Sequence, residues 1–395
     1  MQKKLMAVAV AGIFAAPALV HAQASNVQIY GRITYEYGYV TKMGDGPVAG
    51  TTFNAERDKT DVAQTPGGSA VGFRGSEKLG GGLTAWFQCE SSADVRGINQ
   101  NGFCTRNSAI GFKGKWGNLH FGRWDSPMKR AGNMGLAGAK GTGLLGASFV
   151  FSGGSGGVNS VNASNRNRWR RRDVGWTYYE SPKFSGFQIL AAFTPGNDAT
   201  NAANGAGNTK ARTTSLGGVW KQGPFQVGLG WEEHAQFGAE GVGIADADDS
   251  GWVLGGAYTF ANKVKVAASY LDVEYETGGG TNIDKENWLV GVDWKIAGPH
   301  SFHAAFVQAG DSEGSGTIAN GVTTIGSDVA PAGASTGADW FSVAYQYGFS
   351  KRTSARFGYV QVKPDTNSGY TLGGLSSQIN GQKQEALVMY LQHNF

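Results

Sequence analysis

The residues with the most evident chemistry are basic side chains gathered in one stretch of the chain. Between Ser126 and Arg172 there is no Asp or Glu, and the basic residues of this stretch are Lys129, Arg130, Lys140, Arg166, Arg168, Arg170, Arg171 and Arg172. Ammonium and guanidinium groups attract anions, and arginine binds carboxylates and phosphates through two parallel hydrogen bonds. The chemistry that this stretch predicts is electrostatic selection of anions, with no covalent bond made or broken.

Other reactive residue types do not converge on a catalytic or metal site. No histidine lies next to a Gly-x-Ser-x-Gly nucleophile motif. His300 and His303 fall on opposite faces of a strand and have no evident acidic ligands nearby. The segment from Gly141 to Gly146 matches G-x-G-x-x-G, but no βαβ unit surrounds it. We therefore expect no enzymatic activity, no metal, no cofactor and no nucleic-acid partner.

The first residues have the pattern of an export signal. Lys3 and Lys4 precede an apolar run, and the segment ends at Ala22 with a small-x-small pattern. We expect residues 1–22 to be a cleaved signal peptide and residues 23–395 to form one mature domain. A retained membrane helix is the alternative, which the short apolar core disfavours.

The cysteine count fits an exported protein. Cys89 and Cys104 are the two cysteines of the chain. In an oxidising compartment we expect them to form a disulfide, whereas two free thiols are the alternative.

Segments of about ten residues with alternating apolar and polar positions recur along the rest of the chain. In one of them, Trp288, Val290 and Val292 share a face opposite Asn287 and Gly291. Gly, Pro, Asn and Asp separate sixteen such segments, an even number as in bacterial single-chain barrels. The predicted strands are 27–40, 70–75, 82–92, 107–116, 118–125, 172–181, 186–194, 213–221, 225–234, 251–260, 263–275, 287–296, 301–310, 340–349, 354–363 and 384–395.

Short turns alternate with long polar connections, as they do at the two rims of an outer-membrane barrel. The long connections are 41–69, 93–106, 126–171, 195–212, 235–250, 276–286, 311–339 and 364–383. The mean hydropathy of −0.27 fits a barrel, because lumen-facing polar residues alternate with lipid-facing apolar ones. The prediction is an all-β, sixteen-stranded antiparallel transmembrane β-barrel with long extracellular loops.

Several segments resemble the general diffusion porins of Gram-negative outer membranes, most of all their betaproteobacterial branch. The segments are Val27–Gly31, Gly72–Leu83, Phe87–Glu90, Gly111–Gly114, Phe121–Arg123, Tyr179–Phe187 and His393–Phe395. The resemblance implies a homotrimer in the bacterial outer membrane whose third long loop folds into the lumen. It also implies that the terminal strand, with Leu391, His393 and Phe395, is the signal that the barrel-assembly machinery reads. The cysteine pair and the absence of acidic residues from the third loop depart from the family pattern.

A positive constriction follows if the third loop lines the narrowest part of the lumen. Lys129, Arg130 and Lys140 lie deepest in the loop, and Arg168, Arg170 and Arg172 follow nearer its end. The last group has a second interpretation, in which it lies at the extracellular end of a strand and binds lipopolysaccharide phosphates. Arg32, Arg74 and Lys113 alternate with apolar residues and are expected to face the lumen.

These observations predict a water-filled channel for passive diffusion of small hydrophilic solutes and ions, with a preference for anions. The expected partners are outer-membrane lipid and lipopolysaccharide, further copies of the same chain, the assembly machinery and the permeating solutes. Two alternatives stay open. One is a channel specific for small organic anions or aromatic carboxylates, and the other is a surface adhesin.

Overall fold

The structure is a computed structural model that describes residues 27–41, 59–64, 68–96, 102–138, 143–153, 169–195, 212–236, 248–276, 281–315, 333–373, 375 and 380–395. The expected signal peptide, residues 1–22, lies outside this part of the chain. No helix among the described residues is long and apolar enough to cross a membrane.

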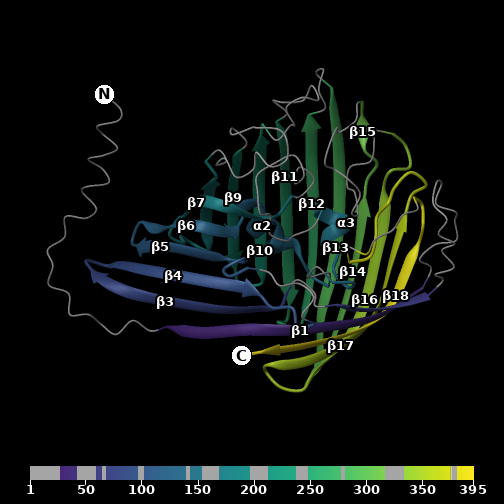
Figure 1. Cartoon of the computed structure of the whole chain (residues 1–395), viewed down its shortest axis with the longest axis horizontal. Coiled ribbons are helices and arrows are strands. Elements are labelled where there is room, and N and C mark those ends of the chain that lie inside the picture. Colours follow the sequence, from purple (N-terminus) through teal and green to yellow (C-terminus); the bar gives the residue numbers. More distant parts are fainter. Residues whose placement is uncertain are drawn as a thin grey trace.

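Strands make up most of the described chain (Figure 1). The strands are β1 (Gln28–Thr41), β2 (Lys59–Gln64), β3 (Ala70–Gly80), β4 (Leu83–Ser92), β5 (Ser108–Gly114), β6 (Gly117–Asp125), β7 (Arg172–Glu180), β8 (Phe187–Phe193), β9 (Arg212–Gln222), β10 (Phe225–Ala235), β11 (Asp249–Phe260), β12 (Val264–Glu276), β13 (Asn282–Ala297), β14 (His300–Ala309), β15 (Glu313–Gly314), β16 (Ala338–Gly348), β17 (Thr353–Pro364) and β18 (Gln384–Asn394). Between β6 and β7 lie the helices α2 (Pro127–Gly132), η1 (Asn133–Gly135) and α3 (Ser148–Ser152).

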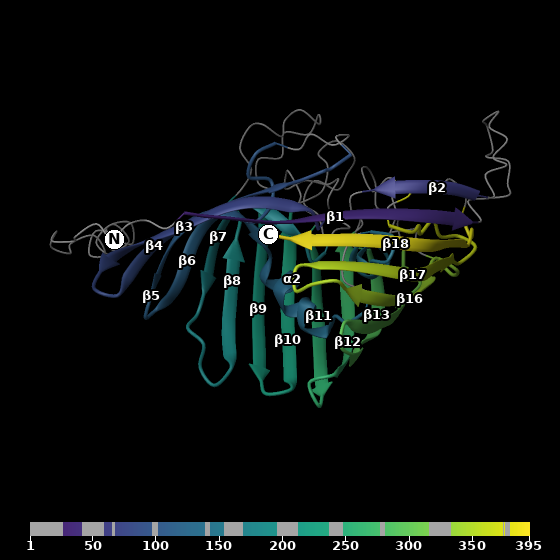
Figure 2. The ribbon, with the colours of Figure 1, turned by 90° about the horizontal axis from the view of Figure 1, so that it is seen from below.

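The strands close into one antiparallel barrel. Neighbouring strands in the sequence pair with one another, and β18 pairs with β1 to close the ring, with Met389 opposite Tyr37. Figure 2 shows β18 running alongside β1. Of the eighteen strands of the sheet in the described chain, β2 and β3 occupy one position in the wall and β15 has only two residues, which leaves sixteen wall strands. The predicted sixteen-stranded barrel is confirmed.

One predicted loop is partly wrong. Residues 41–69 were expected to form a long connection, but β2 lies within them and pairs with the second half of β1. Strand β3 pairs with the first half of β1, so β2 and β3 form one interrupted strand. The sequence of β2, KTDVAQ, does not alternate in polarity. Backbone hydrogen bonds to β1 define this strand, and a hydropathy pattern does not report them.

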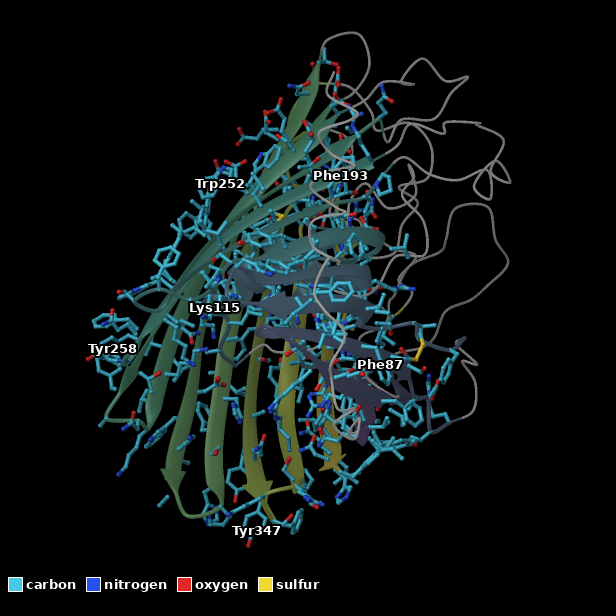
Figure 3. All side chains as sticks on the ribbon, turned by 90° about the vertical axis from the view of Figure 1, so that its left-hand side faces the viewer. Phe87, Lys115, Phe193, Trp252, Tyr258 and Tyr347 are labelled. Carbon is cyan, nitrogen blue, oxygen red and sulfur yellow. A yellow bond between two sulfur atoms is a disulfide. The ribbon has the colours of Figure 1, made fainter. Side chains whose placement is uncertain are left out.

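The two faces of the wall differ as the alternation predicts. In β13, Trp288 and Val290 are 52% and 50% exposed, whereas Asn287 and Leu289 are buried. Figure 3 shows Trp252 and Tyr258 on the outside of the wall. Successive side chains of a strand point to opposite faces, so the residues between these exposed aromatic and aliphatic positions face the lumen. This parity identifies the lumen-facing residues along each stretch of strand without a bulge, whereas in β7 the register shift between Asp173 and Trp176 reverses it.

Candidate functional site

The described parts of the connection between β6 and β7, residues 126–138, 143–153 and 169–171, fold inside the barrel. Ser126 begins helix α2 by accepting the backbone N–H of Lys129 on its side-chain oxygen at 3.1 Å, and Pro127 occupies the first turn. Helix α2 packs on β8 to β11, η1 on β10 to β12, and α3 on β13 and β14. Figure 1 shows α2 and α3 beside these strands. We call residues 126–171 the third loop.

Glycines in the wall allow the third loop to approach closely. A Cβ atom added to Gly230 would lie 2.6 Å from the Cα of Met128, and one added to Gly255 would lie 2.8 Å from the nitrogen of Gly135. Their sequence neighbours Leu229 and Leu254 are 54% and 46% exposed on the outer face, so both glycines face the lumen. The loop backbone therefore rests directly on the inner wall, which no larger residue at these positions would permit.

The middle of the third loop reaches the opposite wall. The backbone N–H groups of Leu144 and Leu145 donate to the carboxylate of Glu36 on β1 at 3.2 and 3.4 Å. On the other side, the N–H of Gly138 donates to Asp293 of β13 at 2.8 Å. The loop thus contacts strands on two sides of the lumen, and it narrows the space between them.

The end of the third loop is anchored by a buried ionic network. Arg171 is fully buried and pairs with Asp173 at 3.0 Å and with Glu232 of β10 at 3.4 Å, and it donates to Thr213 at 2.6 Å. His234 lies 3.0 Å from the same Glu232 carboxylate. A buried cation needs such partners because the loss of hydration is costly. We call Arg171, Asp173, Glu232 and His234 the loop anchor.

The tryptophan before this network adds a second attachment. The ring of Trp169 stacks on His234 with centroids 4.2 Å apart, and its N–H donates to the hydroxyl of Tyr275 at 2.7 Å. Both partners belong to strands, so the return of the loop to β7 is fixed from two sides.

The predicted basic residues of the third loop have carboxylate partners on the wall. Lys129 pairs with Asp125 at 2.8 Å, and Arg130 pairs with Glu180 at 2.7 Å. Arg172 pairs with the same Asp125 at 3.0 Å. Burial lowers the pKa of Lys129 to about 8. Part of the positive charge of the loop is therefore neutralised where the loop meets the strands.

The placement of two predicted residues differs from expectation. Arg170 and Arg172 were expected either to face the lumen or to bind lipopolysaccharide at the extracellular end of a strand, but they are only 2% and 6% exposed. Arg170 donates to Asn133 at 2.7 Å and lies over the ring of Phe151, so its charge is held inside the folded loop. Lys140 and Arg168 lie outside the described residues. The acidic partners come from strands, so the composition of the loop alone did not reveal them.

Three of the predicted cations lie on the lumen side of the wall. The register pairs Arg32 with Asn394, Arg74 with Gln28, and Lys113 with Asn118, all on the face opposite the exposed apolar residues. Arg74 donates to the amide oxygen of Gln28 at 2.8 and 2.9 Å, and Lys113 lies 4.6 Å above the ring of Trp86. Arg32 donates to the carbonyl of Gly68 at 2.9 Å.

These three cations have no anionic partner in the described part of the chain, where the ion pairs involve other residues. Arg356 of β17, which was not predicted, behaves in the same way: it lies opposite Gln346 on the lumen side of the wall and donates to that amide at 2.9 Å. Its alternation with the exposed Phe357 is the signal that would have identified it.

A cavity of about 750 Å³ lies on the same side of the lumen. Its lining includes Gln28, Arg74, Trp86, Lys113, Asn118 and Glu180, from strands β1 and β3 to β7. Among the described lining residues, Glu180 alone is acidic, and Arg130 of the third loop already pairs with it. The cavity therefore has a net positive charge. Such a site can concentrate anions, and its described lining contains no nucleophile paired with a base.

A family model described as Gram-negative porin matches residues 7–369. The chain belongs to the Gram-negative porin family. An outer membrane porin protein of Bordetella pertussis is 28% identical over 288 residues, which cover 68% of this chain and 69% of the Bordetella protein. This agrees with the predicted betaproteobacterial resemblance.

Solved porin structures share the fold. An anion-selective porin from Comamonas acidovorans superposes with a TM-score of 0.67 at 20% identity, over 94% of this porin and 100% of the other chain. The trimer form of OmpT, an outer membrane protein of Vibrio cholerae, gives 0.62 at 14% identity, over 94% and 100% of the two chains. At these identities the likeness concerns the fold alone.

Family and fold together give the general activity. The porin forms a channel in the bacterial outer membrane through which small hydrophilic solutes and ions diffuse passively. The predicted function class and location are confirmed at this level.

The second long connection of the porin has a covalent link at its base. A disulfide joins Cys89 of β4 to Cys104, with Cα atoms 4.8 Å apart, and it is visible near Phe87 in Figure 3. Cys89 faces Phe73 across the strand pair, so the disulfide lies on the outer side of the wall.

The terminal strand closes the porin wall through its last residue. The backbone N–H groups of Gly31 and Phe395 donate to each other's carbonyls at 3.1 Å. Leu391 and Phe395 are 42% and 45% exposed on the outer face, and His393 contacts Thr353 at 2.9 Å. An apolar outer stripe at the chain end is thus present in the folded barrel.

Proposed function

We propose that this porin prefers anions over cations. The observation that carries the proposal is the set of lumen-facing cations without a carboxylate partner among the described residues, namely Arg32, Arg74, Lys113 and Arg356. A basic lining raises the local concentration of anions and lowers that of cations. The anion-selective porin from Comamonas acidovorans, which shares the fold, supports the same direction.

The main source of anion selectivity is then the barrel wall, and the third loop contributes less than its sequence alone suggests. Lys129, Arg130 and Arg172 keep their charge but share it with Asp125 and Glu180. These three cations share two carboxylates, so together they leave a net charge of about one positive unit. Lys140 and Arg168 remain proposed members of the constriction.

The size of the effect follows from Coulomb's law. For a hydrated ion about 6 Å from one fixed charge in water, the interaction is about 332/(80 × 6), or about 0.7 kcal/mol, which changes local ion concentration about threefold. The charge attracts anions and repels cations, so the ratio of the two changes by roughly an order of magnitude before salt screening.

The test is the zero-current potential across a planar bilayer under a potassium chloride gradient. Arg74→Gln and Lys113→Gln, separately and together, should move the potential stepwise toward zero. Lys263→Gln is the matched control, because Lys263 is an exposed residue of the short β11–β12 turn. Unchanged potentials in the double variant would contradict the proposed role of the wall cations.

We also propose the arrangements that the family resemblance implies. Residues 1–22 act as a cleaved signal, residues 23–395 form the mature barrel, and the mature chain assembles as a homotrimer in contact with lipid and lipopolysaccharide. The trimer form of the Vibrio OmpT structure supports the trimer. The exposed stripe ending at Phe395 supports recognition by the assembly machinery. We also expect the porin to catalyse no reaction.

A further inference from the structure

Two neighbouring short turns of the barrel carry exposed lysines. Lys115 lies between β5 and β6, and Lys183 lies between β7 and β8. Strand β6 pairs with β7, so the two turns are neighbours at the rim of short turns, which is the periplasmic rim of such a barrel. Residues 115–116 and 181–186, which form these turns, include no Asp or Glu. The rim is therefore positively charged at this place.

An exposed aromatic residue follows each of the two lysines. Trp116 and Phe184 are 44% and 54% exposed. The ring of Trp116 stacks on Tyr179 with the ring planes 11° apart, and the hydroxyl of Tyr179 donates to the carbonyl of Trp116 at 2.7 Å. Phe184 packs edge to face against Phe187, with the ring centroids 5.1 Å apart. Contacts with the strands thus hold both aromatic rings of the turns.

These contacts lie on the outer face of the wall. Phe121 of β6 and Ile189 of β8 are exposed there, and Leu119 and Phe187 lie two residues from them on the same face. Tyr179 of the intervening β7 lies directly opposite Leu119 in the strand register, so it shares this face. The two turns therefore lie at the edge of an apolar outer surface that spans β6, β7 and β8.

The spacing of lysine and aromatic residue places the charge at the level of lipid headgroups. Aromatic residues at the ends of barrel strands lie at the boundary between the hydrocarbon core and the headgroups. The headgroup layer is about 5–7 Å thick on each side of the membrane, and adjacent Cα atoms are about 3.8 Å apart. The ammonium groups of Lys115 and Lys183 are therefore within reach of lipid phosphates.

We propose that these two turns bind anionic phospholipids of the periplasmic leaflet. Lys115 and Lys183 attract the headgroups, and the acyl chains lie along the apolar outer surface of β6 to β8. A zwitterionic lipid gains less, because its own amine compensates the phosphate charge. A soluble anion would make no use of the outward aromatic rings. The proposal rests on the proposed contact of the barrel with lipid, which it narrows to one lipid class and one rim.

The experiment measures quenching of Trp116 fluorescence in the full-length porin, reconstituted in phosphatidylcholine vesicles. The emission that is absent from Trp116→Phe isolates this residue. Brominated phosphatidylglycerol should quench it at about fivefold lower mole fraction than brominated phosphatidylcholine at low salt, the preference that one interfacial cation gives. High salt should reduce this preference.

Two double variants locate the site. Lys115→Gln with Lys183→Gln should abolish the preference for phosphatidylglycerol. The matched control is Arg212→Gln with Lys363→Gln, which should leave it unchanged, because these exposed cations lie at the ends of β9 and β17 away from the short turns. Lys183→Gln alone should lower the preference, and it serves if the first double variant does not fold.

The outcomes separate this site from the other proposals. Equal quenching by the two lipids, or an unchanged preference in the Lys115→Gln, Lys183→Gln variant, would overturn the site. Loss of the preference on addition of soluble glycerophosphate at constant ionic strength would assign the lysines to a soluble anion and also overturn it. Quenching by neither lipid would contradict the proposed lipid contact of this face itself. The zero-current potential of the same preparation tests the anion preference independently.

Discussion

Replacing Arg171 by Met should destabilise the barrel and release the end of the third loop. Arg171 pairs with both Asp173 and Glu232, and all three side chains are fully buried. Methionine keeps the apolar stem and removes the charge. Two carboxylates then remain together in a site from which water is excluded, the situation in which breaking a buried ion pair costs about 3–5 kcal/mol.

This cost corresponds to a decrease of about two to four orders of magnitude in the folding equilibrium constant. The measurement is urea unfolding of the porin in lipid vesicles, followed by tryptophan fluorescence. Trp169 stacks on His234 of the same loop anchor, so its emission should also change in the folded variant under native conditions. Single-channel conductance should become noisier, because the loop end loses one of its two attachments to β10, the ion pair with Glu232, and keeps only the stacking of Trp169 on His234.

The control is Arg352→Met in the exposed turn between β16 and β17, where a surface substitution changes stability by about 0.5 kcal/mol or less. If Arg171→Met matched this control, the loop anchor would contribute no net stability. The double variant Arg171→Met with Glu232→Gln should recover part of the loss, because it removes one of the two stranded carboxylates. No recovery would refute the electrostatic explanation and favour lost packing.

Other contacts in the barrel give three shorter tests. Gly230→Val should displace helix α2 and alter single-channel conductance. Gly256→Val is the control and should leave conductance unchanged, because a Cβ added to Gly256 has no neighbour closer than 3.6 Å. Equal conductance in the two variants would contradict the close approach of the third loop to the wall. Non-reducing mass analysis should find Cys89 linked to Cys104, and two free thiols would be the opposing result. Burial lowers the pKa of Lys129 to about 8, so this residue is cationic below that pH and neutral above it. The preference of the channel for anions should therefore decline as the pH rises from about 7 to about 9. The Lys129→Met variant should lack this pH dependence.

The barrel was predictable because its determinants are local. Alternation such as Trp288, Val290 and Val292 opposite Asn287 and Gly291 is visible within one strand, and the pairing of successive strands requires no long-range information. Lumen-facing positions such as Arg74 and Lys113 follow from the same parity. Strand β2 was missed because its residues do not alternate and only the backbone of β1 defines it.

The electrostatics of the third loop could not be predicted from its own residues. The partners of Lys129, Arg130 and Arg171 are Asp125, Glu180 and Glu232, and the last two come from strands whose register the loop sequence does not specify. The charges of the loop residues alone therefore overestimate the charge that solutes meet.

The inward glycines were not predicted for a related reason. Gly230 and Gly255 fit equally well as turn or small lumen residues until the loop that rests on them is placed. Their role depends on a contact between segments about a hundred residues apart in the sequence, which alternation within a strand does not reveal.

The most direct measurement is the sign of the zero-current potential of the unmodified porin in a planar bilayer with potassium chloride at unequal concentrations on the two sides. We predict stepwise pores with a potential that favours chloride, because Arg32, Arg74, Lys113 and Arg356 face the lumen without carboxylate partners among the described residues. A potential that favours potassium would contradict the basic lining as the source of selectivity, although the channel itself would stand.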